Sequence, residues 1–331
     1  MSNSLCTIVV PVFNEEKNIK NLFYEIQKQD YQHIEVLFID DGSTDQSVDI
    51  IEKIVSDKKS ISVRLIKQKN MGAARARKAG IENARGDYIA FVDCDDCLST
   101  NAISSAMEYF IKKNGEINDI VLFNLVHVDS LSEKDMGTPF NLYTEKLQVS
   151  GDEAFGSCID KWGLHGFGIY RKKNLEISYA IYEYLNTANE NYLNNDEIIA
   201  RICYANANRV ITSCSGIYYF VNNPYSTVRR VNNNYHRVIF NSVLLFKYIN
   251  ERYKQNDGVA KKALILESST IWGVARRYYQ WNKLNIDKVA WSNSVRFGIN
   301  DYLKNISANI KIVNIKGVIQ IFLAYLIIVW K

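Results

Sequence analysis

Two closely spaced carboxylates are the first feature of the sequence that could do chemistry. Asp93 and Asp95 are separated only by Cys94, and they directly follow a short apolar run. Mg²⁺ and Mn²⁺ take hard oxygen ligands and bridge phosphate oxygens, so a carboxylate pair can hold such an ion against a diphosphate. The spacing therefore predicts a metal site for a phosphorylated ligand at Asp93 and Asp95.

Two other apolar runs also end in polar segments. These segments are Pro11-Val12-Phe13-Asn14-Glu15-Glu16 and Asp40-Asp41-Gly42-Ser43-Thr44-Asp45. One such segment has a simple structural explanation, because Asp and Ser commonly cap the following helix. Three of them favour a ligand site. Neither a G-x-G-x-x-G turn nor a glycine-rich Lys-Ser/Thr loop follows the first run, so we do not expect backbone amides to cradle the phosphates.

The apolar pattern predicts the elements that position these segments. Buried strands are expected at 5–12, 36–39, 63–66 and 88–92, and amphipathic helices at 19–26, 48–55, 73–84 and 102–112. Strands that alternate with helices indicate an α/β fold with a mostly parallel sheet. Ligands bind beyond the carboxyl ends of the strands in such sheets, so the three polar segments are expected to meet at one edge.

Four segments occur in an order and at separations that are familiar. They are 11–15 (Pro-Val-Phe-Asn-Glu), 40–45 (Asp-Asp-Gly-Ser-Thr-Asp), 70–75 (Asn-Met-Gly-Ala-Ala-Arg) and 86–96 (Gly-Asp-Tyr-Ile-Ala-Phe-Val-Asp-Cys-Asp-Asp). Together they resemble the motifs of family 2 glycosyltransferases. The resemblance implies a GT-A fold, which is a Rossmann-like, mostly parallel sheet flanked by helices. It also implies a nucleoside diphosphate sugar donor and inversion at the anomeric carbon.

The resemblance places the nucleoside part of the donor site on the first two segments. Pro11, Phe13 and Glu15 would line the nucleoside pocket. Asp41 would accept a hydrogen bond from the base, which in a uridine-type donor comes from the ring N–H. Cys94 would lie at the centre of the same donor site.

The diphosphate and metal side of the site falls on the other two segments. Arg75 resembles the basic residue that contacts the donor diphosphate, although it could also be a solvated helix charge like Arg77 and Lys78. Asp93 would contact the ribose or the metal. Asp95 would bind Mn²⁺ or Mg²⁺ directly.

The acceptor half of the resemblance centres on residues 194–199 (Asn-Asn-Asp-Glu-Ile-Ile). Asp196 matches the family's catalytic base, and it precedes an apolar pattern of helical spacing, which places it near a helix N-terminus. An Asp at that place could instead simply cap the helix. The family's usual Glu is replaced by Asn195, a departure from the pattern, and Glu197 is the alternative base.

Charge separates the C-terminal part of the chain from the rest. The 331 residues carry a net charge of +4, but from His236 onward fifteen basic residues face five acidic ones, which gives +10 there and leaves −6 for the remainder. A basic segment on an acidic body predicts an anionic surface or substrate. No nucleic-acid-binding motif accompanies it, so no nucleic acid partner is expected. The six cysteines form no dense framework, which favours reduced thiols in a cytoplasmic protein.

The apolar run at residues 318–330 is expected to lie on a membrane. It is shorter than the roughly 20 residues that span a bilayer. Lys316 and Lys331 flank it and Trp330 stands at its edge, which suits a helix in the head-group plane. The alternatives are burial against the catalytic domain or against a second subunit, so a homo-oligomer stays open. The predicted regions are a nucleotide-sugar-binding half (1–115), an acceptor-binding half (116–232) and a C-terminal helical, basic, membrane-associating region (233–331).

The sequence thus predicts a metal-dependent hexosyltransferase at the inner face of the cell membrane. It would move a sugar from a UDP-linked donor to a hydroxyl of a lipid-linked glycan acceptor in capsule or O-antigen biosynthesis. One rival is a sugar nucleotidyltransferase, which would be expected to carry a glycine-rich basic loop where residues 13–16 stand. The other is a non-catalytic membrane-bound scaffold with a transferase fold, and intact Asp93, Asp95 and Asp196 argue against it.

Overall fold

A computed structural model describes residues 4–57, 61–110, 117–223, 231–254 and 256–329. The chain divides into two compact units. The first unit comprises residues 1–155, 163–181 and 199–223, and the second comprises residues 156–162, 182–198 and 224–331. Three of the five divisions fall within helices, which are α5 (Gly151–Cys158), α6 (Lys172–Leu185) and α7 (Asn195–Ala205).

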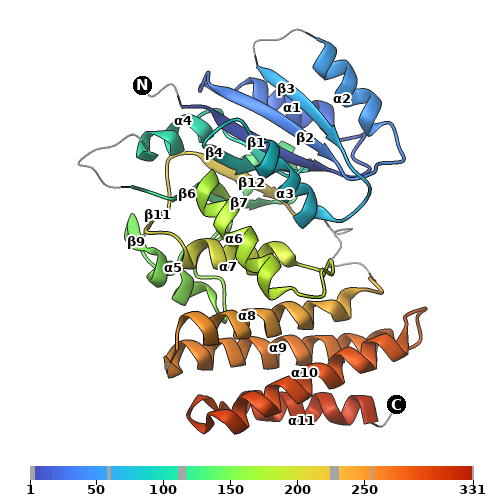
Figure 1. Cartoon of the computed structure of the whole chain (residues 1–331). Coiled ribbons are helices and arrows are strands. Elements are labelled where there is room, and N and C mark those ends of the chain that lie inside the picture. Colours follow the sequence, from blue (N-terminus) through green and yellow to red (C-terminus); the bar gives the residue numbers. More distant parts are fainter. Residues whose placement is uncertain (1–3, 58–60, 111–116, 224–230, 255, 330–331) are drawn as a thin grey trace. The chain divides into compact units, whose positions relative to one another are not determined.

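The first unit is built on an eight-stranded sheet in the order β3-β2-β1-β4-β10-β6-β11-β9 (Figure 1). The strands are β1 (Cys6–Val12), β2 (Ile34–Asp40), β3 (Ser62–Lys67), β4 (Tyr88–Phe91), β6 (Ile120–Leu122), β9 (Gln148–Ser150), β10 (Gly168–Arg171) and β11 (Arg209–Ile211). The four strands β3, β2, β1 and β4 are parallel. Only β10 and β9 run against their neighbours. The mostly parallel sheet expected from the sequence is confirmed.

The four predicted strands and four predicted helices of the N-terminal part are present. The helices are α1 (Ile19–Gln27), α2 (Ser47–Ser56), α3 (Ala73–Asn83) and α4 (Ala102–Met107). The helix expected at 102–112 tightens into a 3₁₀ turn at Glu108–Phe110, and 111–112 lie outside the described residues. β1 and β2 are buried almost throughout, which explains why both read as continuous apolar runs.

Helix α3 lies directly against β1 because of one glycine. A Cβ at Gly80 would collide with the side chain of Val9 in β1. Gly72, just before the helix, has a φ of 88° that other residues rarely adopt. These two glycines fix how α3 approaches the sheet, and α3 carries Arg77, which pairs with Asp93.

A smaller second sheet flanks the same unit, in the order β5-β12-β7-β8. Its strands are β5 (Cys97–Leu98), β7 (Asn124–Val128), β8 (Thr138–Pro139) and β12 (Ile217–Val221). β12 pairs antiparallel with β5 and parallel with β7. Because β5 directly follows the acidic segment 93–96, the pairing of β5 with β12 ties that segment to the smaller sheet.

The second unit is largely helical. Its long helices are α8 (Val238–Arg252), α9 (Asp257–Trp281), α10 (Lys288–Ala308) and α11 (Ile315–Val329). α9 contacts each of the other three, and Trp291 and Tyr302 of α10 are fully buried among them. Within the described residues, no helix is long and apolar enough to cross a membrane.

A buried carboxyl group gives the second unit a predicted pH dependence. Glu267 of α9 is completely buried; burial raises its pKa from 4.5 to about 8, and the nearby Asp301 acts in the same direction. The folded state therefore holds a proton that the unfolded state has lost. Stability is fully present below pH 4.5 and is expected to fall by up to about 1.4 kcal/mol per pH unit as pH rises toward 8.

Urea unfolding of the full chain between pH 5 and pH 9 checks this expectation. Glu267→Gln removes the titrating group and should flatten the profile and raise stability at pH 8. Glu251→Gln, at an exposed position on α8, is the matched control and should keep the slope of the wild type. A wild-type stability that does not decline between pH 5 and pH 8 would contradict the buried proton.

Candidate active site

The loops that follow β1 and β2 are joined by hydrogen bonds. Asn14, in a left-handed conformation with φ of 58°, donates its N–H to Ser43 Oγ at 3.0 Å and accepts from Thr44 N–H at 2.8 Å. The N–H of Glu15 is 2.8 Å from Ser47 Oγ. The two polar segments predicted to share one sheet edge therefore do so, and they form one continuous surface.

The nucleoside-pocket residues predicted from the sequence lie on or beside this surface. Phe13 is 47% exposed, which is a large exposure for a Phe and leaves its ring face open to stack on a ligand. The carbonyl of Pro11 accepts a weak hydrogen bond from the Cys94 thiol at 3.6 Å. Cys94 is buried, which raises its pKa well above the usual range. Its thiol thus joins β1 to the acidic segment.

Asp41 is buried, and its carboxylate already accepts several hydrogen bonds from neighbouring residues. Its carboxylate accepts hydrogen bonds from the N–H groups of Met71 and Gly72 at 2.8 and 2.7 Å and from Gln68 Nε2 at 2.8 Å. A carboxylate has about four acceptor positions, so one is left for a ligand. Asp41 fixes the start of α3, and its predicted contact with a base stays a prediction.

Three carboxylates from two strand ends influence one another. Burial raises the pKa of Glu15, and the charges of Asp95 and Asp93 act in the same direction against a hydrogen bond from Asn18. Burial also raises the pKa of Asp95, with Asp93 adding to it and a hydrogen bond from Asn223 opposing it. The charged forms of Glu15 and Asp95 are therefore held at a cost that a nearby positive charge would relieve.

Arg77 supplies part of that positive charge. Its guanidinium forms a 2.8 Å ion pair with Asp93 Oδ1, and only 13% of its side chain is exposed. The alternative interpretation of Arg77 as a solvated helix charge is therefore wrong. Arg75 lies on the same helix with its Nη1 3.7 Å from Met71 Sδ, and its role at a diphosphate stays a prediction.

Behind the acidic segment, Asp96 has a structural role that the sequence did not indicate. Asp96 Oδ2 accepts from the Tyr218 hydroxyl at 2.7 Å, and Oδ1 accepts from the Val221 N–H at 2.8 Å. Burial raises the pKa of Asp96, and Asp93 adds to the effect. The Tyr218 hydroxyl also accepts from the Asp93 N–H at 3.3 Å. Strand β12 therefore fixes the backbone that presents Asp93 and Asp95.

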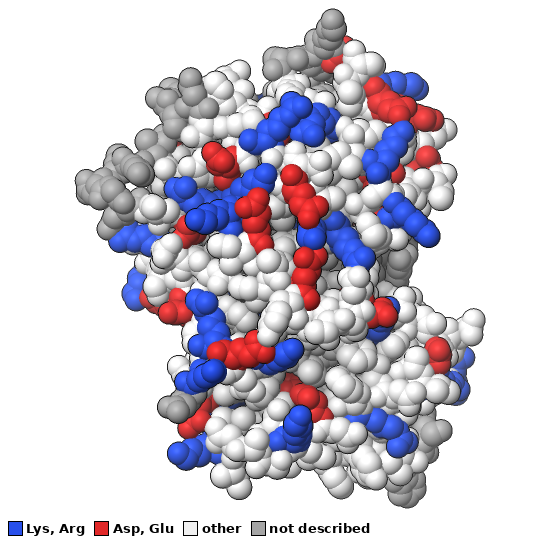
Figure 2. All heavy atoms as spheres, viewed as in Figure 1, with Lys and Arg blue, Asp and Glu red and all other residues white. Residues whose placement is uncertain are grey.

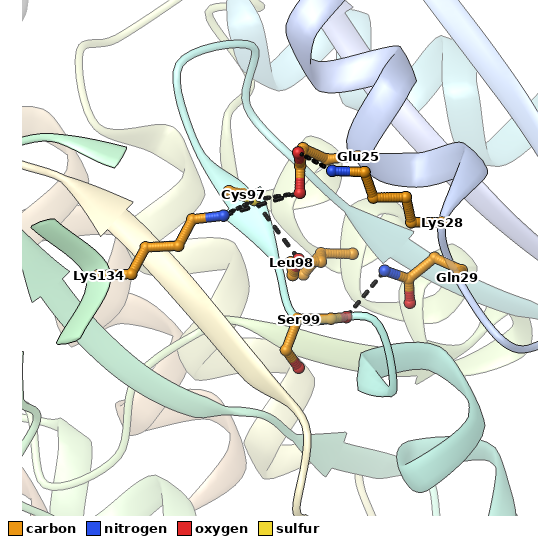
Figure 3. Close-up of polar contacts among 7 residues, drawn as sticks. All are labelled: Glu25, Lys28, Gln29, Cys97, Leu98, Ser99 and Lys134. Carbon is orange, nitrogen blue, oxygen red and sulfur yellow. Dashed lines mark hydrogen bonds and ion pairs between the residues drawn. The ribbon is translucent and has the colours of Figure 1, made fainter. Parts of the chain in front are cut away.

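The two thiols of the Cys94-x-x-Cys97 sequence point to different partners. All described cysteines are free and buried. Figure 3 shows Cys97 in a separate cluster, where its thiol donates to Glu25 Oε2 at 3.6 Å and accepts from Lys134 Nζ at 3.1 Å. Lys28 completes this cluster through a 2.7 Å ion pair with Glu25. The arrangement joins α1 to β5 and gives Cys97 different hydrogen-bond partners from those of Cys94.

Asp196 is exposed in the first turn of α7, within the second unit. Asn195 beside it is buried and accepts from the Tyr182 hydroxyl at 2.8 Å and from Asn241 Nδ2 at 3.0 Å. An uncharged amide suits this buried network, which explains physically why Asn stands where the family usually has Glu. Asn194 donates to Glu197 Oε1 at 2.9 Å. Of the adjacent acids, Asp196 is thus the more accessible.

The donor set of the first unit fits a hard divalent cation. Asp93 and Asp95 offer carboxylate oxygens, and burial raises the pKa of Asp95 and of Glu15, with the charge of Asp93 acting in the same direction on both. Among the described residues, no group of three or more His, Cys, Asp or Glu side chains has the arrangement of a metal site. A cation here would accordingly rest on the Asp93 and Asp95 pair together with ligand oxygens.

Comparison with known proteins identifies the class. Residues 7–163 match the profile of Glycosyl transferase family 2. The structure resembles that of Staphylococcus aureus TarS residues 1–349 in complex with UDP-GlcNAc, with a TM-score of 0.66 and 20% identity over 92% of this chain and 83% of that one. This likeness shows the GT-A fold of glycosyltransferases. Residues 7–163 belong to glycosyl transferase family 2.

Curated relatives share the same part of the chain. Glycosyltransferase GlyG of Streptococcus pneumoniae serotype 4 is 36% identical over 128 residues, which cover 38% of this chain and 41% of GlyG. An uncharacterized glycosyltransferase of Haemophilus influenzae is 35% identical over 114 residues, covering 34% and 45%. TarS, a poly(ribitol-phosphate) β-N-acetylglucosaminyltransferase, is 25% identical over 217 residues, covering 65% and 35%. The chain spans less than half the length of these relatives.

Proposed function

We propose that this protein is an inverting, metal-dependent glycosyltransferase that takes its sugar from a UDP-linked donor. The observation that carries the proposal is the group of carboxylates at the ends of β1 and β4, where Glu15, Asp93 and Asp95 interact beside the Arg77 guanidinium. Such a group suits a nucleoside diphosphate with a cation, and it stands within the family 2 domain. The UDP-GlcNAc complex of TarS supports a uridine donor.

In the proposed reaction, different residues of the chain bind the base, the diphosphate and the cation and accept the proton. Phe13 stacks on the base, and Arg77 and Arg75 face the diphosphate. Asp93 and Asp95 hold Mn²⁺ or Mg²⁺, which when bound supplies positive charge to the leaving diphosphate. Asp196 takes the proton of the acceptor hydroxyl as that oxygen attacks the anomeric carbon in a single displacement.

We further propose a glycan acceptor carried on a lipid, in the biosynthesis of a surface polysaccharide such as capsule or O-antigen. The relative TarS is a poly(ribitol-phosphate) β-N-acetylglucosaminyltransferase, and a polymeric acceptor of that kind supports the assignment. The enzyme would work at the cytoplasmic face of the membrane as a peripheral protein. The basic, aromatic character of residues 236–331 supports such an attachment.

A panel of sugar nucleotides tests the proposed function. We expect the purified chain to release UDP from one UDP-sugar in the presence of Mn²⁺ or Mg²⁺, and EDTA should abolish the release. GDP-, CDP- and dTDP-sugars serve as matched controls for the base. Pyrophosphate release from UTP and a sugar 1-phosphate would instead identify a nucleotidyltransferase. Absence of both turnover and nucleotide binding would favour the scaffold alternative.

A further inference from the structure

The segment that joins α10 to α11 exposes two isoleucines to an unusual degree. Ile310 is 81% exposed and Ile315 is 79% exposed, which are the highest values among the large apolar side chains of the described residues. Each stands next to an exposed lysine, Lys311 and Lys316 respectively. Single exposed apolar side chains are ordinary. Two of them on one short segment indicate a surface that is covered, and so removed from water, when the protein functions.

Helix α11 continues this apolar surface. Its inner side, formed by Gly317, Ile321, Ala324 and Ile328, is buried, and the helix contacts α9 and α10. Its outer side remains apolar and exposed through Val318, Ile319, Phe322, Leu323, Tyr325 and Val329. A helix that is apolar on all sides is normally covered on all sides. We call the outer side of α11 together with Ile310, Lys311, Ile315 and Lys316 the C-terminal face.

The sequence that contains the C-terminal face is basic. No acidic residue follows Asp301 in the sequence, and the only charged side chains after it are Lys304, Lys311, Lys316 and Lys331. Figure 2 shows one face of the molecule, and uncharged side chains cover much of the part where the C-terminal helices lie. Asp257 also lies beside this segment, where its Oδ1 accepts a hydrogen bond from Asn309 Nδ2 at 2.7 Å. Exposed apolar side chains with Lys311 and Lys316 among them are complementary to a layer of anionic head groups above hydrocarbon.

A second copy of the chain fits this surface less well. A two-fold dimer through the C-terminal face would place the same lysines of both copies at one interface, because such an interface uses identical patches. Like charges brought together oppose association. A lipid surface has the opposite charge and accepts the apolar side chains at the same time.

We propose that the C-terminal face docks on an anionic lipid bilayer, with Ile310 and Ile315 inserted below the head groups and Lys311 and Lys316 at their level. This inference deepens the membrane attachment in the proposed function and rests on it. α11 then lies in the plane of the interface. No described helix of the chain is able to cross the bilayer, which agrees with attachment from one side.

Vesicle cosedimentation of the full chain tests the proposal. We expect binding to phosphatidylcholine vesicles that contain about 30% phosphatidylglycerol, weak binding to phosphatidylcholine alone, and weaker binding at 0.5 M than at 0.1 M NaCl. Ile310→Glu with Ile315→Glu should lower the partition coefficient by on the order of 100-fold or more. Lys311→Gln with Lys316→Gln should lower it about 30-fold on the anionic vesicles only.

Matched controls distinguish binding through the C-terminal face from nonspecific hydrophobic or electrostatic adsorption to the vesicles. Met136, in the first unit, is 74% exposed, so Met136→Glu makes the same kind of change elsewhere. Lys20→Gln removes an exposed charge on α1. Both controls should bind as the wild type does. Equal binding by the double isoleucine variant, absence of binding to anionic vesicles, or a dimer in solution that the isoleucine substitutions dissociate would each overturn the proposal.

The result of the vesicle experiment can be distinguished from a failure of the proposed glycosyltransferase activity. Vesicle binding is measured without donor or acceptor, and release of UDP from a soluble donor is measured without vesicles. The double isoleucine variant should keep the latter activity while it loses membrane binding. Loss of the donor reaction in the wild type would defeat the proposed function and leave the vesicle result unaffected.

Discussion

Replacing Asp95 with Asn is expected to lower sugar transfer about 1000-fold, because it removes a negative ligand of the proposed cation without changing the shape of the side chain. Stability should not suffer. Burial and the neighbouring Asp93 raise the pKa of Asp95, so its charge is held unfavourably in the folded protein without a cation. Steady-state kinetics with Mn²⁺, together with thermal unfolding with and without Mn²⁺, check both expectations.

A control substitution of an exposed carboxylate shows whether the expected loss of transfer is specific to Asp95. Asp49→Asn changes an exposed carboxylate on α2 in the same unit and should leave kcat and the thermal response to Mn²⁺ as they are. If Asp95→Asn kept turnover within about twofold of the wild type, or kept the full stabilisation by Mn²⁺, Asp95 would not be the metal ligand.

Asp196→Asn is the second substitution with a large expected effect. General bases contribute about 10²- to 10⁴-fold, so we expect kcat to fall about 1000-fold while the dissociation constant for the UDP-sugar stays the same. Asp196 is exposed in the first turn of α7. If it merely stabilised the helix terminus, its loss would cost only about 0.3–1 kcal/mol of stability and no activity.

Glu197→Gln is the matched control, since it removes an acid at the neighbouring position in the same helical turn. The two substitutions should lower the melting temperature by similarly small amounts, because both act on the same helix terminus. Only Asp196→Asn should remove transfer. The reverse pattern, with activity lost in Glu197→Gln, would move the base to Glu197.

The sequence was sufficient for the part of the fold that local apolar patterns determine. The runs that became β1 and β2 are continuous because both strands are buried almost throughout, and such runs can be recognised without a structure. β5 has two residues and β12 five, and they pair across more than a hundred positions. Pairings of this kind leave almost no local pattern, so the smaller sheet was not predicted.

Two details of the candidate site depended on that missing geometry. Which carboxylates of the segment 93–96 face a ligand is decided by Tyr218 and Val221, which turn Asp96 inward. The ion pair of Arg77 with Asp93, which the sequence analysis did not predict, depends on the rotation of α3. Arg77 stands at helical spacing from the buried Ala74 and Ile81, a signal that would have placed it toward the sheet.

The hydrogen bonds from β12 to Asp96 also bear on whether the part of the chain that carries the proposed donor motifs can fold as a separate module. Asp96 and the strand residues that satisfy it are 122 and 125 positions apart. A fragment limited to residues 1–115 would keep every donor motif. In that fragment Asp96 would lose its hydrogen-bond partners Tyr218 and Val221. During synthesis on the ribosome, the acidic segment therefore adopts its folded conformation only after β12 has emerged from the ribosome. Gene fusions or truncations that divide the chain before residue 217 are expected to yield a donor half that has the motifs and lacks the site.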